Sequence, residues 1–171
     1  MPKSISSIVV LLLTATCCNT AVITEKDLDI GTSLIPHAGN GVFTRVFIPA
    51  NTYLGSYAGK FITRQEHMKL FREDKWHYVM GLLECAEANT GGFTNIDGVN
   101  GNVFTRMNYA PKEFQNVRFV KTCDPPFVKI LSTKDVKPGE ELYVDYGEHY
   151  IYDFMLDPEV IRFFREKGQQ R

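Results

Sequence analysis

Short strand-forming runs dominate the chain after about residue 24, and they constrain the fold more than any other feature of the sequence. Runs rich in β-branched and aromatic residues occupy 42–48 and 53–62, with the turn-forming Pro49-Ala50-Asn51 between them. We predict these two runs to be adjacent strands. Two further strands are predicted at 117–120 and 127–131. Many short, irregularly spaced strands fit neither a doubly wound α/β fold nor a regular sandwich, so we predict a β-rich α+β fold with long loops.

Two helices are predicted from the residues that mark their ends. Thr63-x-x-Glu66 is a capping box, and an amphipathic stretch follows it to about residue 73. Near the C-terminus, Asp157-Pro158 suits a helix start and Gly168 suits a helix end, which predicts a C-terminal helix over 158–167. Its expected apolar stripe consists of Val160, Ile161, Phe163 and Phe164.

Two other segments have a clear pattern. Residues 141–146 alternate strictly, so that Leu142, Val144 and Tyr146 are expected on one face of a last strand and Tyr143 on the other. Residues 76–85 are mostly apolar and are predicted to be buried, although the pattern alone leaves helix and strand open.

The composition is that of one globular domain. The chain has 171 residues, 44% of them hydrophobic and 23% charged, which is enough to bury a core without a metal or disulfide framework. The net charge of −1 does not suit nucleic-acid binding. The four histidines show no metal-ligand spacing, so they are predicted to be surface or hydrogen-bonded residues: His37, His67, His77 and His149.

The N-terminus differs from the rest of the chain. Lys3, the apolar run 8–13 and the small-residue stretch 14–21 predict a signal peptide over residues 1–21, followed by a domain over 25–171. The protein is therefore expected to be secreted. No run approaches the roughly 20 apolar residues of a membrane helix. The alternative is that these residues begin an intracellular protein of the nucleus or cytoplasm.

Cys85 and Cys123 are the cysteines in the body of the chain. They permit one disulfide at most, and neither belongs to a Cys-x-x-Cys pair, so zinc binding and thiol redox chemistry are poorly supported. We predict a buried, reduced pair.

Common catalytic signatures, such as phosphate loops, Gly-x-Ser-x-Gly and His-Glu-x-x-His, are missing. Instead, short elements occur in a fixed order over about 110 residues. They are Gly39-Asn40-Gly41-Val42-Phe43, Tyr57-Ala58-Gly59, Ile96-Asp97-Gly98 with 101–110 and 115–117, and 138–147 with the sequence Pro-Gly-Glu-Glu-Leu-Tyr-Val-Asp-Tyr-Gly.

Together these elements resemble the SET domain over roughly residues 34–150. The resemblance implies several small sheets, a knot-like C-terminal segment and transfer of a methyl group from S-adenosylmethionine to a protein lysine, with histone tails as the usual substrates. It implies that Tyr146 is the active-site phenol. The implied cofactor-binding residues are Gly39, Asn40, Gly41, Tyr57, Asn108 and Tyr109, and the candidate walls of the lysine channel are Tyr78, Tyr150 and Tyr152. No metal is implied.

An aromatic channel suits this chemistry because the nucleophile must be a neutral amine. Free lysine has a pKa of about 10.4, so presenting the neutral form at pH 7 costs roughly 4.6 kcal/mol. A dry channel lowers that cost, since desolvation disfavours the ammonium.

The sequence also departs from the family pattern. Thr105, Arg106, Tyr109 and Ala110 stand where the family usually has Arg, Phe, His and Ser. A SET-like domain that has lost catalysis and acts as a peptide-binding or scaffolding module is therefore an alternative. A third is a secreted β-rich protein in which these elements are ordinary turns. A signal peptide on a SET-like body further suggests a secreted protein that acts in a host nucleus.

Overall fold

The computed structural model describes residues 23–148, 150 and 152–169. The predicted signal peptide and His149 lie outside the described residues. The strands are β1 (Leu28–Thr32), β2 (Asn40–Thr44), β3 (Tyr53–Ser56), β4 (Lys60–Ile62), β5 (Val79–Gly81), β6 (Asn95–Asp97), β7 (Asn108–Tyr109), β8 (Val117–Lys121), β9 (Val128–Ser132) and β10 (Tyr143–Val144). The α-helices are α1 (Arg64–Arg72), α2 (Ala86–Thr90) and α3 (Pro158–Gln169), and short 3-10 helices cover Glu25–Asp27, Val103–Arg106 and Asp153–Leu156.

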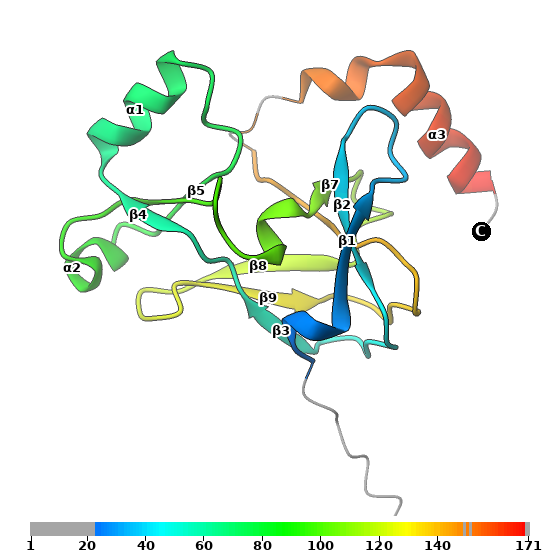
Figure 1. Cartoon of the computed structure of the whole chain (residues 1–171), viewed down its shortest axis with the longest axis horizontal. Coiled ribbons are helices and arrows are strands. Elements are labelled where there is room, and N and C mark those ends of the chain that lie inside the picture. The colour runs from blue at the N-terminus through cyan, green and yellow to red at the C-terminus, as the bar shows by residue number, and fades with distance from the viewer. Residues whose placement is uncertain (1–22, 149, 151, 170–171) are drawn as a thin grey trace, which may run out of the picture.

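Small sheets make up the body of the fold, as predicted. The orders are β1-β2, β3-β9-β8, β4-β6-β5 and β7-β10. All pairings are antiparallel except β7 with β10, which is parallel. In Figure 1 the β4-β6-β5 sheet lies with α1 and α2 on one side of the molecule, and β1, β2 and α3 lie on the other. This β-rich α+β architecture with a C-terminal helix confirms the predicted fold class.

The predicted pairing of the runs 42–48 and 53–62 is wrong. The first run contributes β2, which pairs with β1, and the second divides into β3 and β4, which pair with β9 and β6. Strand propensity is a local property that does not specify the pairing partner: β3 and β4 pair with strands tens of residues away, and β2 pairs with the strand just before it. The turn between the runs therefore joins two sheets and does not form a hairpin.

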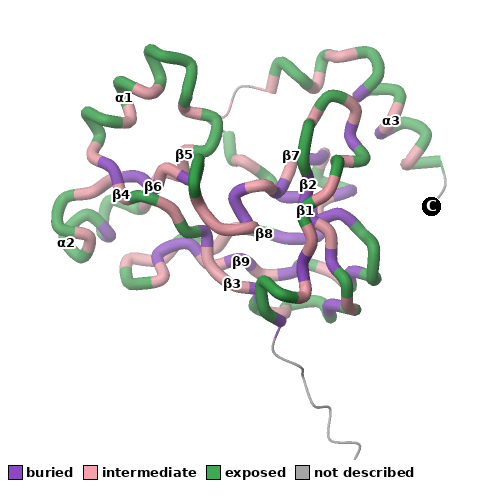
Figure 2. The backbone as a smooth tube through the Cα atoms, viewed as in Figure 1, coloured by how far each residue is buried: buried purple, intermediate pink, exposed green. Residues whose placement is uncertain are grey.

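Two buried clusters support these sheets. Leu142 and Val144 belong to the main core, and Tyr146 packs against it, whereas Tyr143 belongs to a second core beneath α3. The predicted alternation of the last strand is thus confirmed, with both of its faces buried. Figure 2 shows burial concentrated along the central strands, while α1 and the outer turns are exposed.

Both predicted helices are present. The Thr63 hydroxyl of the capping box accepts the backbone N–H of Glu66 at 3.2 Å, and the Glu66 carboxylate accepts the backbone N–H of Thr63 at 2.8 Å. The C-terminal helix starts at Pro158 as predicted but continues through Gly168 to Gln169. Val160 and Phe164 of the predicted stripe are buried, and Ile161 is 41% exposed.

The cysteine prediction is wrong. Cys85 and Cys123 form a disulfide, with their Cα atoms 5.2 Å apart, and Cys85 is exposed. The bond links the start of α2 to the turn between β8 and β9. In the same place the Asn89 side chain donates to the Cys123 carbonyl at 3.1 Å and to the Asp124 carboxylate at 2.8 Å. The spacing of two lone cysteines carries no information on this contact.

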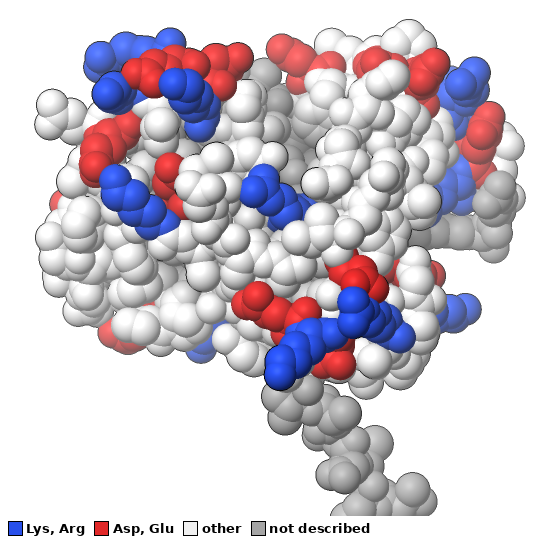
Figure 3. Space-filling view, viewed as in Figure 1, with Lys and Arg blue, Asp and Glu red and all other residues white. Residues whose placement is uncertain are grey.

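Residues 76–85 are not buried as predicted. The segment forms β5, an edge strand of its sheet, and Tyr78 and Leu83 are 37% and 40% exposed. Its side chains are apolar because several of them line a cavity. No helix in the described part of the chain is long and apolar enough to cross a membrane. Figure 3 shows basic and acidic side chains side by side over α1, with a mostly uncharged surface between α1 and α3.

Candidate active site

A buried carboxylate brings three distant sequence elements together. Glu141 is 2% exposed and accepts hydrogen bonds from the Ser33 hydroxyl (2.7 Å), the Leu34 amide (2.8 Å), the Asn108 side chain (3.1 Å) and the Tyr143 hydroxyl (2.9 Å). Asn108 also donates to the Asn40 carbonyl at 2.9 Å. The first, third and fourth elements therefore meet here.

Steric constraints explain why the first element has two glycines. A Cβ on Gly41 would lie 2.1 Å from a Glu141 carboxylate oxygen, and Gly39 has a φ of +72°, which favours glycine. Both glycines are thus needed to bring the turn against the carboxylate. Glu141 was part of the fourth element but was not predicted to organise the site.

The parallel pair of β7 and β10 positions Tyr146. Tyr143 pairs with Asn108 and Val144 with Tyr109, so the chain just after β10 runs beside the third element. The Tyr146 hydroxyl donates to the Met107 carbonyl at 2.8 Å, directly next to Asn108. The predicted meeting of Tyr146, Asn108 and the early glycine turn is present.

A cavity of about 390 Å³ lies on one side of Tyr146. Asn108 and Tyr109 line it, and Asp157 and Val160 come from the start of α3. The other lining residues are Ile35, Pro36, His37, Ala38, His77, Tyr146, Tyr150 and Phe154. Its volume lies in the usual range of about 300–1,000 Å³ for small-molecule sites.

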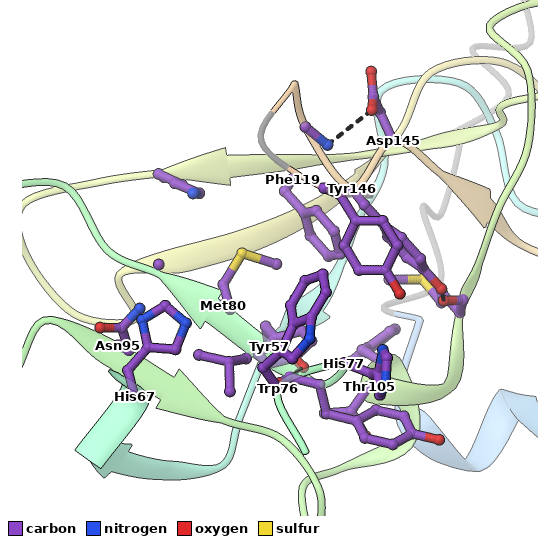
Figure 4. Close-up of a pocket in the computed structure, with 18 of the residues that line it drawn as sticks. Tyr57, His67, Trp76, His77, Met80, Asn95, Thr105, Phe119, Asp145 and Tyr146 are labelled. Atoms are coloured by element: carbon purple, nitrogen blue, oxygen red, sulfur yellow. Dashed lines mark hydrogen bonds between the residues drawn. The ribbon is translucent and has the colours of Figure 1, made fainter. Parts of the chain in front are cut away.

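A second cavity, of about 780 Å³, also borders Tyr146. Tyr57, Trp76, Tyr78 and Phe119 contribute aromatic walls, and Figure 4 shows Trp76 in the middle of the cavity with Tyr146 to one side. Tyr146 and Tyr150 line both cavities, as does His77, with the two tyrosine rings 4.6 Å apart. These side chains form the common wall.

The Tyr146 phenol is held in its protonated form. Burial is the main cause that raises its pKa, and the neighbouring Tyr150 adds to the effect. A phenol with a raised pKa remains a hydrogen-bond donor at neutral pH, which agrees with its bond to the Met107 carbonyl. Tyr146 can therefore orient groups at the common wall but is poorly suited to remove a proton.

Several predicted site residues do not line the cavity that holds Asn108 and Tyr109. Gly39, Asn40 and Gly41, predicted to bind the cofactor, line neither cavity. Tyr57, predicted beside the cofactor, lies in the larger cavity and donates to the Tyr78 carbonyl at 2.6 Å. Tyr152, predicted in the lysine channel, lines neither cavity; its ring lies 4.4 Å from that of Tyr109, and its hydroxyl donates to the Gly147 carbonyl at 2.7 Å. Tyr78, predicted in the lysine channel, lines the larger cavity.

Trp76 is a cavity residue that the sequence reasoning missed. Its ring lies 5.6 Å from Phe71, 5.1 Å from His77 and 5.1 Å from Tyr150. It thus connects the end of α1 to the common wall. The run Trp76-His77-Tyr78, directly after a predicted helix, was the available signal.

The residues that depart from the family pattern have structural contacts. The Thr105 hydroxyl donates to the Asn102 carbonyl at 2.9 Å, and Ala110 is fully buried. The Arg106 guanidinium lies 4.6 Å from the centre of the Tyr78 ring and donates to the Val99 carbonyl at 2.7 Å. Among the described residues, no group of three or more His, Cys, Asp or Glu side chains is arranged to hold a metal ion.

The fold and this pair of cavities define the class of protein. The SET domain family model matches residues 39–147, so the chain belongs to the SET-domain family. Histone-lysine N-methyltransferase EZH2 of Chaetomium thermophilum is 25% identical over 141 residues, which span 73% of this chain and 8% of that protein. The chain therefore corresponds to less than a tenth of this relative.

Solved structures share the fold. Chaetomium thermophilum Polycomb Repressive Complex 2, in an autoinhibited conformation bound to S-adenosylmethionine, matches with a TM-score of 0.60 and 23% identity, over 83% of this chain and 17% of that chain. The methyltransferase domain of human PR domain-containing protein 2 matches with a TM-score of 0.53 and 20% identity, over 73% of this chain and 80% of that chain.

Proposed function

We propose that this protein is an S-adenosylmethionine-dependent protein-lysine N-methyltransferase. The observation that carries the proposal is the common wall of the two cavities, where Tyr146 and Tyr150 separate a space of about 390 Å³ from one of about 780 Å³. Methyl transfer between two large substrates requires that donor and acceptor enter from different sides and meet in line. Membership of the SET-domain family and the similarity to a histone-lysine N-methyltransferase add support.

The smaller cavity fits S-adenosylmethionine in its size and chemistry. The rings of Tyr109 and Phe154 offer flat apolar surfaces to a purine, while the Asn108 amide and the turn 35–38 supply polar and backbone groups. The Gly39–Gly41 turn keeps this wall in place through the bond from Asn108 to the Asn40 carbonyl. The bound molecule would supply an electrophilic methyl group: the neutral lysine amine would form an N–C bond to the methyl carbon as the C–S bond breaks, so that the sulfur leaves as the neutral thioether S-adenosylhomocysteine and the positive charge passes to the methylated amine.

The larger cavity fits the acceptor lysine. Tyr57 and Phe119 pack edge to face with their ring centres 5.9 Å apart, and Tyr146 closes the wall beside them. Rings that exclude water disfavour the ammonium and so raise the share of neutral amine. The Tyr146 hydroxyl, fixed by the Met107 carbonyl, is placed to orient that amine.

The finer points of the proposal concern substrate and location. We propose a histone-type protein substrate on the similarity to the Chaetomium relative. Secretion, with action in a host nucleus, is supported by the signal-like residues 1–21 and by the Cys85–Cys123 disulfide, since such bonds form in oxidising compartments. Mass spectrometry of the mature protein tests this: an N-terminus near residue 22 and an intact disulfide are expected, and a retained residue 1 with reduced cysteines would contradict it.

A second candidate function is a catalytically inactive SET-like module that binds peptides. Tyr109, which stands in the position of the family's histidine, favours it because its ring packs against Tyr152 at 4.4 Å and Phe154 at 6.0 Å on the smaller cavity. Such packing could occupy space that a nucleoside needs. A thermal shift with S-adenosylmethionine separates the two functions, since the inactive module should show none.

Transfer of a labelled methyl group tests the enzyme directly. Labelled S-adenosylmethionine and a histone mixture are incubated with the wild type, with Tyr146→Phe and with Tyr53→Phe, an exposed tyrosine outside both cavities. We expect Tyr146→Phe to lose about 100-fold or more, because a misplaced reacting group costs that much. Tyr53→Phe should match the wild type. Equal transfer by all three proteins would overturn the role of Tyr146, and a well-folded wild type that neither binds S-adenosylmethionine nor transfers label would overturn the enzyme.

A further inference from the structure

The larger cavity has oppositely charged ends. Asp145 and Glu148 line it at the end that holds Tyr146. His67, Asn95 and Lys121 also line it. Figure 4 shows Asn95 and His67 together on the side of the cavity opposite Tyr146 and Asp145. A substrate that fills the cavity therefore meets acidic groups at one end and hydrogen-bond donors at the other.

The position of Lys121 follows from its strand. Val117, Phe119 and Lys121 share one face of β8, since side chains alternate along a strand. Val117 lies next to Asn116, which is bonded to Tyr143, and Phe119 packs on Tyr57 in the middle of the cavity. Lys121 lies about 7 Å further along the strand, so its amine belongs to the end away from Tyr143 and β10.

These donors have no partner in the part of the chain that the structure describes. Among the described residues the Lys121 amine makes no ion pair or hydrogen bond, and neither does the His67 ring. The Asn95 side chain accepts from the Thr94 hydroxyl at 2.8 Å, which leaves its NH₂ group undonated. In the described residues, every fully buried side-chain nitrogen or oxygen has a hydrogen-bond partner. An NH₂ group without a partner is therefore not fully buried, so it reaches the cavity.

The environment of Lys121 favours an anionic partner. Partial desolvation lowers the pKa of its amine even though the residue as a whole is exposed, and burial lowers the pKa of His67 as well. An ammonium that has lost water without gaining a counter-charge gains most from a carboxylate or phosphate. The described residues supply the positive charge of the Lys121 ammonium but no anionic partner for it.

We propose that Lys121, with Asn95 and His67, forms a subsite for an acidic side chain of the substrate, a few residues from the acceptor lysine. The lysine enters at the end with Asp145 and Glu148, whose negative charges attract its ammonium during approach. The acceptor part of this inference rests on the proposed function; the binding of an acidic side chain does not. The ligand class is an anionic oxygen group, supplied by Glu or Asp or by a phosphorylated serine.

Fluorescently labelled peptides test the subsite through binding, which needs no catalysis. Each peptide carries one lysine and, at two to five residues to either side, Glu, Gln, phosphoserine or serine. Anisotropy should show that the wild type binds the best Glu peptide about 3- to 10-fold more tightly than its Gln partner. A preference for phosphoserine over Glu assigns the subsite to phosphate, and the reverse preference assigns it to a carboxylate; either supports it.

Two variants separate a subsite from a general charge effect. Lys121→Glu should reverse the preference, so that a peptide with Arg in place of Glu binds best, and Lys121→Met should abolish it. Lys129→Glu is the matched control, because Lys129 lies on the neighbouring β9, opposite Val120, and does not line the cavity. Urea unfolding of each variant confirms that it is folded. An equal loss in Lys129→Glu and Lys121→Glu would overturn the inference.

The same peptides distinguish failure of the subsite from failure of the enzyme. Label transfer to lysine with no preference for acidic peptides in the wild type would overturn the subsite and leave the methyltransferase standing. Binding that prefers acidic peptides through Lys121, with no transfer to any peptide, would support the subsite and contradict the methyltransferase.

Discussion

The two cavities are built in different ways. The smaller one is framed by a buried polar network in which the Glu141 carboxylate receives four hydrogen bonds from groups in three parts of the chain. The larger one is walled by rings that touch edge or face, such as Trp76 on Tyr150, and by donors without partners among the described residues. A fixed frame suits one constant ligand, and a wall of adaptable rings suits variable peptides.

Among the changes that test this difference between the cavities, removing the Glu141 carboxylate should have the largest effect. Glu141→Ala removes the acceptor of one buried and three part-buried hydrogen bonds. A donor left unsatisfied costs about 1–3 kcal/mol when buried and less when water reaches it, so we expect a loss of about 3 kcal/mol in the free energy of unfolding. Binding of S-adenosylmethionine should be lost with it. Urea denaturation measures the first and calorimetry the second. Glu140→Ala is the control, since Glu140 is exposed, and equal behaviour of the two variants would contradict the frame.

Removing the disulfide should lower the free energy of unfolding without changing the smaller cavity. Replacing Cys85 and Cys123 by serine opens a link between residues 38 apart, which in the loop-entropy picture lowers the free energy of unfolding by about 2–4 kcal/mol. Because neither Cys85 nor Cys123 lines either cavity, the affinity for S-adenosylmethionine should stay within about twofold. A large loss of that affinity would show that the two cavities are not independent.

The pH dependence of methyl transfer tests whether the tyrosines of the common wall stay protonated. Burial raises the pKa of Tyr146, Tyr150 and Tyr57, so these phenols stay protonated through neutral and mildly alkaline pH. The acceptor lysine, in contrast, becomes more nucleophilic as it loses its proton. We therefore expect kcat/KM to rise about tenfold per unit between about pH 7 and 9, with no fall in that range. A maximum of kcat/KM below pH 9 in initial-rate measurements would contradict this. It would mean that transfer needs a protonated group of the protein that loses its proton below pH 9.

Trp76→Ala should have the smallest effect of the four. Loss of the ring leaves Tyr150 and the end of α1 without their contact, so we expect kcat/KM for peptides to fall about 5- to 10-fold, mainly through KM. S-adenosylmethionine should bind as before. Val99→Ala, an exposed residue outside both cavities, is the control. A weaker affinity for S-adenosylmethionine in Trp76→Ala, with unchanged KM for peptide, would contradict the assignment of the cavities.

Features set by neighbouring residues could be predicted from the sequence. The capping box at Thr63 and Glu66, the start of α3 at Pro158 and the alternation around Tyr143 each depend on residues within one or two turns or strand steps. The glycine turn meets Asn108 through the bond from Asn108 to the Asn40 carbonyl, although Gly39, Asn40 and Gly41 themselves line neither cavity.

Features set by distant partners could not be predicted. The sheet assignment of β3 and β4, the Cys85–Cys123 bond and the position of Tyr57 depend on segments far away in the chain. Apolar character did not distinguish a buried segment from a cavity wall, which is why 76–85 was misjudged. The Tyr152 ring packs on Tyr109, which is distant in the chain, and no local pattern marks that contact.

A crystal structure with S-adenosylhomocysteine and a lysine peptide tests the central claim most directly. The nucleoside should lie in the smaller cavity against Asn108 and Tyr109, and the lysine side chain should enter the larger cavity with its amine beside the Tyr146 hydroxyl. Both ligands on the same side of Tyr146, or a nucleoside bound anywhere outside the smaller cavity, would contradict the account.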